Sequence, residues 1–135
     1  MAETAGEPQR VVPLAEVEAE RAWLEGRLDL STRRLRDAFS MSRSAVGAHG
    51  RLAVWLQEAG GLDGVPADLA EPYRSELEGR WTDAASVWRE RGMPYEEAMA
   101  LARGGPAERR RAMQIAEELG AVPLVRRLRG QDRGR

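Results

Sequence analysis

His49 is the only histidine in this 135-residue chain, and histidine is the side chain best suited to proton transfer near neutral pH. It stands beside Gly50 at an expected helix end, where a positive charge suits the helix dipole. A catalytic site needs partners placed around such a histidine, and none is found at a suitable spacing. We therefore interpret His49 as structural and predict no catalytic residue.

Acidic pairs are the next candidates for chemistry, because carboxylates bind metal ions. The pairs are Glu96-Glu97 and Glu117-Glu118. Neighbouring residues on a helix point about 100° apart, so each pair is better explained as a solvated face. The chain has no cysteine, which excludes disulfides, thiolate catalysis and cysteine-bound zinc. We predict a protein that is not an enzyme and that holds no metal and no cofactor.

Arginine supplies all 21 basic residues, and the chain has no lysine. The phosphate-binding loop G-x-x-x-x-G-K-[ST] is therefore excluded. Charge is uneven: residues 1–30 hold seven acidic side chains and three Arg, and residues 103–135 hold nine Arg and four acidic side chains. Basic ends of this kind bind anionic partners. The candidate contacts for an anionic partner are Arg109, Arg110, Arg126 and Arg127.

Nucleic acid is the alternative partner for this arginine-rich end. Consecutive arginines on a helix point to different sides, so Arg109–Arg111 alone make no stripe along a phosphate backbone. No recognition helix is evident, and a net charge of −1 argues against strong non-specific binding. We expect direct binding to nucleic acid to be the less favoured function.

Four tryptophans against one phenylalanine allow two interpretations. Aromatic residues at helical spacing usually pack in a core, where each buries about 150–250 Å². Alternatively, some of them line a concave groove for a peptide or a small effector, as in helical arrays. The candidate groove residues are Trp81, Trp88, Arg89 and Tyr95.

The elements that carry these residues are expected to be helices. The pattern Trp81, Ala84, Ala85, Trp88 recurs fourteen residues later as Tyr95, Ala98, Met99, Ala102. Each has the i, i+3, i+4, i+7 spacing of a helix face, and its alanines suit close packing of helices. Two-residue alternation is not sustained anywhere, so strands are not expected. The fold class is all-α, with about eight short helices.

Glycine and proline set the expected helix ends. In the first half, a helix runs from about Pro13 to Glu25 on a pattern of Leu14, Val17, Arg21 and Leu24. A second follows a cap at Ser31 or Thr32 and ends near Gly47 to Gly50, and a third ends at Gly60-Gly61.

In the second half, helices begin at Pro72, Trp81, Pro94, Pro106 and Pro123. The helix from Pro106 turns Ala112, Ile115, Ala116 and Leu119 inward and ends at Gly120. We expect one domain over residues 11–129, divided by a loop at 60–69, with disordered tails at 1–10 and 130–135.

Two short motifs indicate repeated helix pairs. Leu24-Glu25-Gly26-Arg27 recurs as Leu77-Glu78-Gly79-Arg80, each at an expected helix end. The run Gly79, Trp81, Ala84 resembles the turn and second helix of a tetratricopeptide repeat. We therefore predict a tetratricopeptide-like array of antiparallel helix pairs, a fragment of an α-solenoid.

A wider resemblance covers nearly the whole chain. The run from Trp88 to Ala98 is similar to W-x-x-x-G-x-P-Y-E-x-A of the large ATP-binding LuxR-type (MalT-like) transcriptional regulators of actinobacteria. The stretch from Ala112 to Arg129, with its Leu-Gly-Ala turn, resembles the end of their helical region. Val11 to Gly26 resembles its earlier helices.

This resemblance implies the last part of the family's helical region, without its NTPase and without its helix-turn-helix. The implied function is a sensor or relay module that binds a protein or a small effector, or that contacts other domains of a regulator. Whether the chain is a gene fragment or a stand-alone module stays open. A cut array without a polar capping repeat is expected to self-associate. No membrane-spanning run and no secretion signal is present, so we expect a cytoplasmic protein.

Overall fold

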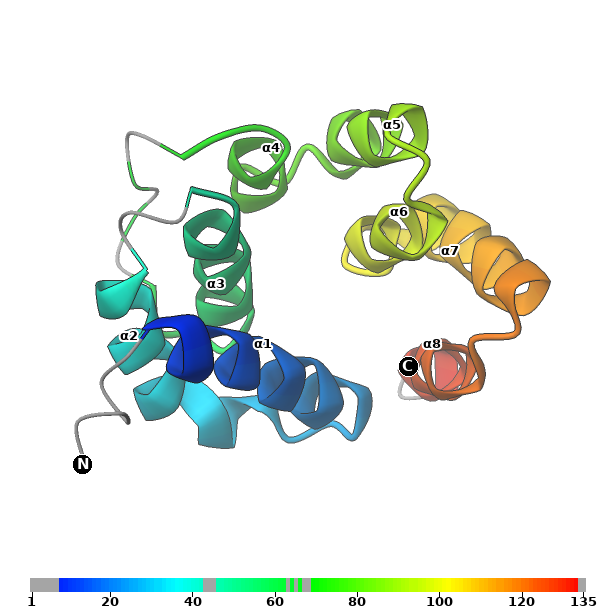
Figure 1. The fold of residues 1–135 in the computed structure, drawn as a ribbon. Coiled ribbons are helices and arrows are strands. Elements are labelled where there is room, and N and C mark those ends of the chain that lie inside the picture. Colours follow the sequence, from blue (N-terminus) through cyan, green and yellow to red (C-terminus); the bar gives the residue numbers. More distant parts are fainter. Residues whose placement is uncertain (1–7, 43–45, 63, 65, 67–68, 134–135) are drawn as a thin grey trace. The chain divides into compact units, whose positions relative to one another are not determined.

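A computed structural model describes residues 8–42, 46–62, 64, 66 and 69–133, and every regular element among them is helical (Figure 1). The all-α prediction, with about eight helices, is confirmed. The elements are α1 (Pro8–Leu24), η2 (Leu28–Ser31, a 3₁₀ helix), α2 (Thr32–Met41), α3 (Val46–Glu58), α4 (Tyr73–Leu77), α5 (Trp81–Glu90), α6 (Pro94–Leu101), α7 (Pro106–Leu119) and α8 (Val122–Arg133).

The chain forms two units, Met1–Leu77 and Glu78–Arg135. The boundary follows α4, whereas the sequence analysis placed the division in the loop at 60–69. Two side-chain bonds explain why α4 belongs with the helices before that loop. Gln57 Nε2 donates to Leu77 O at 2.8 Å, and Arg51 Nη2 donates to Tyr73 Oη at 3.3 Å.

The first unit buries small residues of α1 against larger ones of α2 and α3. Ala15, Ala19 and Ala22 are 3 % exposed or less. Trp23 lies with its ring centroid 6.2 Å from that of Trp55, at an interplanar angle of 56°. Both tryptophans are buried, so the packing interpretation of these two residues is confirmed.

The face of α1 that the sequence pattern emphasised is the outer one. Leu14 and Val17 are 56 % and 63 % exposed, while the alanines beside them pack inward. The predicted start at Pro13 is also wrong. The helix begins at Pro8, which takes the first helical position, so residues 8–10 of the expected tail are helical. Residues 1–7 of that tail lie outside the described residues.

Gly47 and Gly50 lie inside α3 and do not end a helix, contrary to the prediction. The break occurs before Val46, and residues 43–45 lie outside the described residues. Gly50 serves close packing instead: a Cβ at this position would lie 2.3 Å from Tyr73 Cδ2. The small residue is thus required where α4 meets α3.

The repeated Leu-Glu-Gly-Arg motif has the same local structure twice. Gly26 and Gly79 have φ of 77° and 78°, a left-handed conformation that glycine adopts without strain. Arg27 Nε donates to Glu25 Oε1 at 2.8 Å, and Arg80 Nε donates to Glu78 Oε1 at 3.0 Å. The sequence echo therefore marks two equivalent helix-ending turns.

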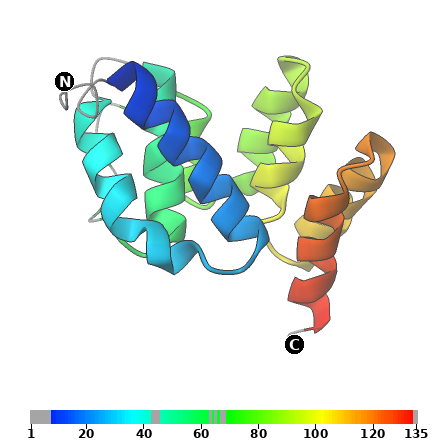
Figure 2. The ribbon, with the colours of Figure 1, turned by 60° about the horizontal axis from the view of Figure 1, so that its bottom comes forward.

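The second unit is a succession of neighbouring helices, in which α5 packs on α6, α6 on α7 and α7 on α8 (Figure 2). Its core combines alanines with a few large residues: Ala84, Ala85, Trp88, Ala98, Leu101, Ala102, Ala112, Ile115, Ala116, Leu124 and Leu128. The close approach predicted from the alanine spacing is confirmed, because Ala84 and Ala98 are fully buried.

Two predictions about the end of the chain are wrong. Leu119 was expected to face inward, but it is the last residue of α7 and is 45 % exposed before the turn at Gly120. The helix α8 begins one residue before Pro123 and continues to Arg133, so residues 130–133 are helical and not a disordered tail. Residues 134–135 lie outside the described residues.

Among the helices of the described residues, none combines the length and the apolar character that crossing a bilayer requires.

Candidate functional site

The four candidate groove residues lie on α5 and α6, but they do not share one open surface. Trp88 is 3 % exposed and packs in the core of the second unit, so it offers almost no area to a partner. Trp81, at the first position of α5, is half-buried, and the Arg103 guanidinium carbon lies 4.6 Å from its ring centroid. Tyr95 is half-buried on α6. A groove that uses Trp81 and Tyr95 stays a prediction.

Arg89 joins α5 to α6 through a buried carboxylate. Its Nε and Nη2 lie 3.0 Å and 2.9 Å from Oε2 of Glu97. The Glu97 side chain is 5 % exposed, whereas that of Arg89 is 60 % exposed. A buried carboxylate is unfavourable unless it is paired, so this arginine has a structural task before any contact with a partner.

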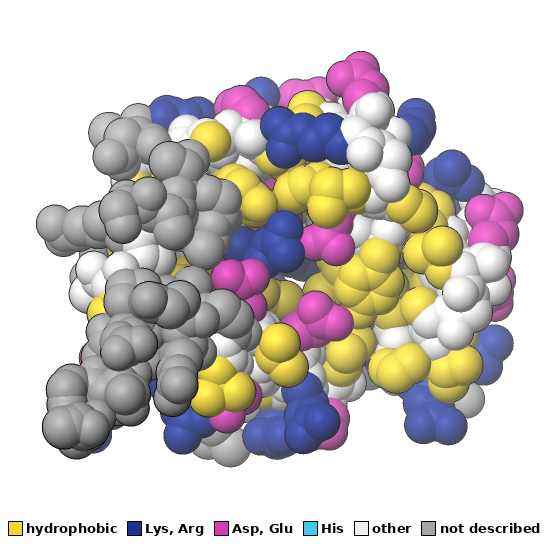
Figure 3. Space-filling model, viewed as in Figure 1, with side chains coloured by type: hydrophobic (Ala, Val, Ile, Leu, Met, Phe, Trp, Pro, Cys, Tyr) yellow, Lys and Arg dark blue, Asp and Glu magenta, His cyan; other side chains and the backbone are white. Residues whose placement is uncertain are grey.

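Figure 3 shows hydrophobic side chains gathered over α5 and α6, with arginine and acidic side chains around them. Such mixed surfaces are common in protein interfaces, whose rims are polar.

The four candidate anion contacts divide between α7 and α8. Arg110 and Arg126 are exposed, and Arg109 and Arg127 are half-buried. Arg109 Nη1 donates to Gly104 O at 2.8 Å. Within the described residues, no hydrogen bond or ion pair involves Arg110. The exposed Arg110 guanidinium is therefore accessible to a partner.

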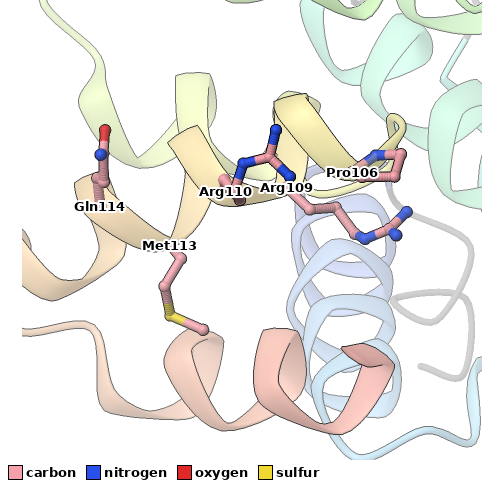
Figure 4. A pocket seen from close by; sticks show the side chains of 5 residues that line it. All are labelled: Pro106, Arg109, Arg110, Met113 and Gln114. Carbon is pink, nitrogen blue, oxygen red and sulfur yellow. The ribbon is translucent and has the colours of Figure 1, made fainter. Parts of the chain in front are cut away.

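A hollow of about 520 Å³ lies on the face of α7 that carries Arg109 and Arg110 (Figure 4). In Figure 4, Arg110 and Gln114 point to one side of this face, and Met113 points to the other side, where α8 lies. The lining residues follow the spacing of one helix face: Pro106, Arg109, Arg110, Met113 and Gln114. We call this surface the α7 hollow.

The turn before α7 fixes the end of this hollow. Gly105 precedes Pro106 as the N-cap, and Glu108 Oε1 accepts the Gly105 N–H at 3.0 Å. Glu108 accepts a hydrogen bond from the Gly105 N–H, and Arg109 donates one to Gly104 O. These two contacts fix the backbone of Gly104 and Gly105 at the mouth of the hollow.

Sequence reasoning identified Arg109 and Arg110 but did not identify Pro106, Met113 and Gln114 as their neighbours. The signal was present in the spacing. These residues recur at i, i+3, i+4, i+7 and i+8 from Pro106, which places them on one side of a helix, away from the buried Ala112, Ile115 and Ala116.

His49 has a serine partner that the sequence analysis missed. Ser42 Oγ lies 2.8 Å from His49 Nδ1 and also donates to Phe39 O at 2.9 Å. The Phe39 ring stacks on the imidazole, with centroids 4.1 Å apart. Ser42 is fully buried, and its contact with His49 joins the residue that follows α2 to the first turn of α3. The structural interpretation of His49 stays a prediction.

Acidic side chains do not assemble into a metal site within the described residues, where no group of three or more His, Cys, Asp or Glu could hold an ion. Glu97 pairs with Arg89, and Glu117 Oε2 lies 3.8 Å from Arg129 Nη2.

Comparison with protein-family models, with curated proteins and with solved structures finds no match to this chain in any of the three.

Proposed function

We propose that this chain is a non-enzymatic helical-repeat interaction module. The observation that carries the proposal is the α7 hollow. There Arg110, which has no ion-pair partner among the described residues, lies near the apolar side chains of Pro106 and Met113. A scaffold of neighbouring helices that exposes such a surface suits the binding of a partner.

The finer proposal is a module that resembles the sensor or relay region of a LuxR-type ATP-binding transcriptional regulator. Three features support it. Gly79 has a left-handed conformation, Trp81 begins α5, and Ala84 is fully buried, as the tetratricopeptide-like motif implies. In such a role, this cytoplasmic module binds a protein or a small effector and transmits that binding to a regulator's activity.

A small DNA-binding regulator is the second candidate, because Arg110, Arg126 and Arg129 are exposed on α7 and α8. The ion pair of Arg129 with Glu117 reduces the positive charge offered there.

Two measurements on the full chain decide between these functions. In the first, a labelled DNA duplex is titrated with the protein at several salt concentrations, followed by fluorescence anisotropy. In the second, the tagged chain is cross-linked in cells, and the attached proteins are identified by mass spectrometry. We expect weak DNA binding and recurrent cross-links to a protein. Tight DNA binding with a steep salt dependence, and no recurrent protein, would contradict the proposal.

A further inference from the structure

We infer that the α7 hollow binds an acidic peptide segment of a protein partner, with one apolar side chain of that segment seated on Met113 and Pro106. This inference rests on the proposed function and adds the chemical class of the partner and the residues that recognise it.

The charge around the hollow favours a carboxylate ligand. Three consecutive arginines, Arg109–Arg111, repel one another, and Glu108 is engaged with the Gly105 N–H. Arg109 is held by Gly104 O and Arg111 Nη1 donates to Gln114 Oε1 at 3.3 Å, whereas Arg110 has no such bond within the described residues. A carboxylate at Arg110 would relieve this repulsion and gain a charge-assisted hydrogen bond.

The apolar side chains of Pro106 and Met113 favour a peptide over a simple anion as the ligand. Met113 is half-buried, and a methionine side chain adapts its shape to an incoming aliphatic group. Pro106 adds a rigid apolar surface one helix turn before Arg110. A phosphate or a nucleic-acid backbone has no apolar group that would pack on Pro106 and Met113. An arginine beside these two side chains therefore favours a peptide.

The length of the hollow limits the segment. Pro106 and Gln114 are eight positions apart on α7, which is about 12 Å along a helix. An extended chain covers this distance with about four residues at about 3.3 Å each. Successive side chains of an extended chain point to opposite sides, so in a segment where carboxylates and aliphatic residues alternate, the carboxylates would face the Arg110 side of the hollow and the aliphatic residues the Met113 side.

The test is a titration of the full chain, labelled with ¹³C in its methionine methyl groups. The probe is a seven-residue peptide of alternating Glu and Leu, and the matched probe has Gln in place of Glu. Met113 reports on the hollow, while Met41 on α2 and Met93 before α6 report on surfaces elsewhere. The same titration is made with Arg110→Gln and with Arg33→Gln, which removes an exposed arginine from α2.

We expect a saturable shift of the Met113 methyl signal with the acidic peptide and a much weaker one with the Gln peptide. Arg110→Gln should weaken binding about tenfold, since a hydrogen bond to a charged group contributes on that scale, and Arg33→Gln should not change it. An unchanged Met113 signal, or equal weakening by both substitutions, would overturn the inference. So would a DNA duplex or inorganic phosphate that shifts Met113 at lower concentration than the peptide.

These outcomes separate the inference from the function on which it rests. If the peptide fails while a protein is still cross-linked to the chain, the interaction function stands and the α7 hollow is not its site. If both fail and DNA binds, the proposed function fails as well.

Discussion

Arg109 Nη1 donates a hydrogen bond of 2.8 Å to Gly104 O, which ties the α7 side chain to the turn that precedes its own helix. Arg110, the next residue, is exposed and forms no ion pair within the described residues. Two neighbouring arginines of the same motif therefore have different tasks: the first orders the mouth of the α7 hollow, and the second is available to a partner.

This difference predicts different effects of the two alanine substitutions on stability. Arg109→Ala should lower the free energy of unfolding by about 1 kcal/mol, because a charge-assisted hydrogen bond is lost. Arg110→Ala should leave it unchanged or slightly raised, since alanine favours helix. Urea denaturation followed by circular dichroism measures both. Equal losses in the two variants would show that Arg110 also has a structural contact.

The close approach of Tyr73 to Gly50 predicts that a larger residue at position 50 would clash with the tyrosine ring. In Gly50→Ala the new methyl group would approach Tyr73 Cδ2 to 2.3 Å, so either the ring or α4 must shift. We expect a loss of about 1–3 kcal/mol, the usual cost of overpacking. Gly130→Ala is the matched control, because Gly130 lies in α8 with nothing within 4 Å of a new Cβ. That control should be stabilised by about 0.5–1 kcal/mol from helix propensity. If Gly50→Ala also gains stability, α4 does not pack on α3 as described.

The contact between Ser42 and His49 predicts a loss of stability when the serine hydroxyl is removed. Ser42→Ala removes the hydroxyl that lies 2.8 Å from His49 Nδ1 and should destabilise the chain by about 1–2 kcal/mol. Ser40, two residues earlier in the last turn of α2, is exposed, so Ser40→Ala should have little effect. The comparison is made by thermal unfolding at a fixed pH. Indistinguishable melting temperatures for the two variants would argue against the Ser42–His49 contact.

The pair of Arg89 and Glu97 predicts a non-additive result. Arg89→Ala leaves the carboxylate of Glu97 buried without its partner and should cost about 1–2 kcal/mol, less than for a fully buried pair because Arg89 is 60 % exposed. Adding Glu97→Gln removes the unpaired charge, so the double variant should be more stable than Arg89→Ala alone. Urea denaturation of the complete cycle measures this coupling. Additive losses would mean that the two side chains do not interact.

Local sequence rules predicted the second unit better than the first. Gly92, Pro94, Pro106 and Gly120 mark helix ends in the structure because their backbone preferences act within a few residues. The same rules wrongly predicted a helix end at Gly50. A glycine is needed there because Tyr73, which lies far along the chain, packs against it. Spacing alone could not show that contact.

The spacing of large apolar residues also failed to predict which face of a helix is buried where alanines form the packed face. Leu14 and Val17 made the stronger apolar pattern on α1, but the alanines beside them allow the close approach to neighbouring helices. Similarly, Arg109 and Arg110 were visible as a motif, but only the capping contacts of Gly104 and Gly105 show which arginine is held.

The central claim is that the chain is an interaction module that uses the α7 hollow. Hydrogen–deuterium exchange tests it most directly, with the full chain measured alone and bound to the protein identified by cross-linking. We predict slower exchange on binding in the peptide that spans Pro106 to Gln114, and weaker protection of the same peptide when Arg110→Gln is mixed with the partner at the same concentrations. Protection confined to other helices, with α7 unchanged, would contradict the account.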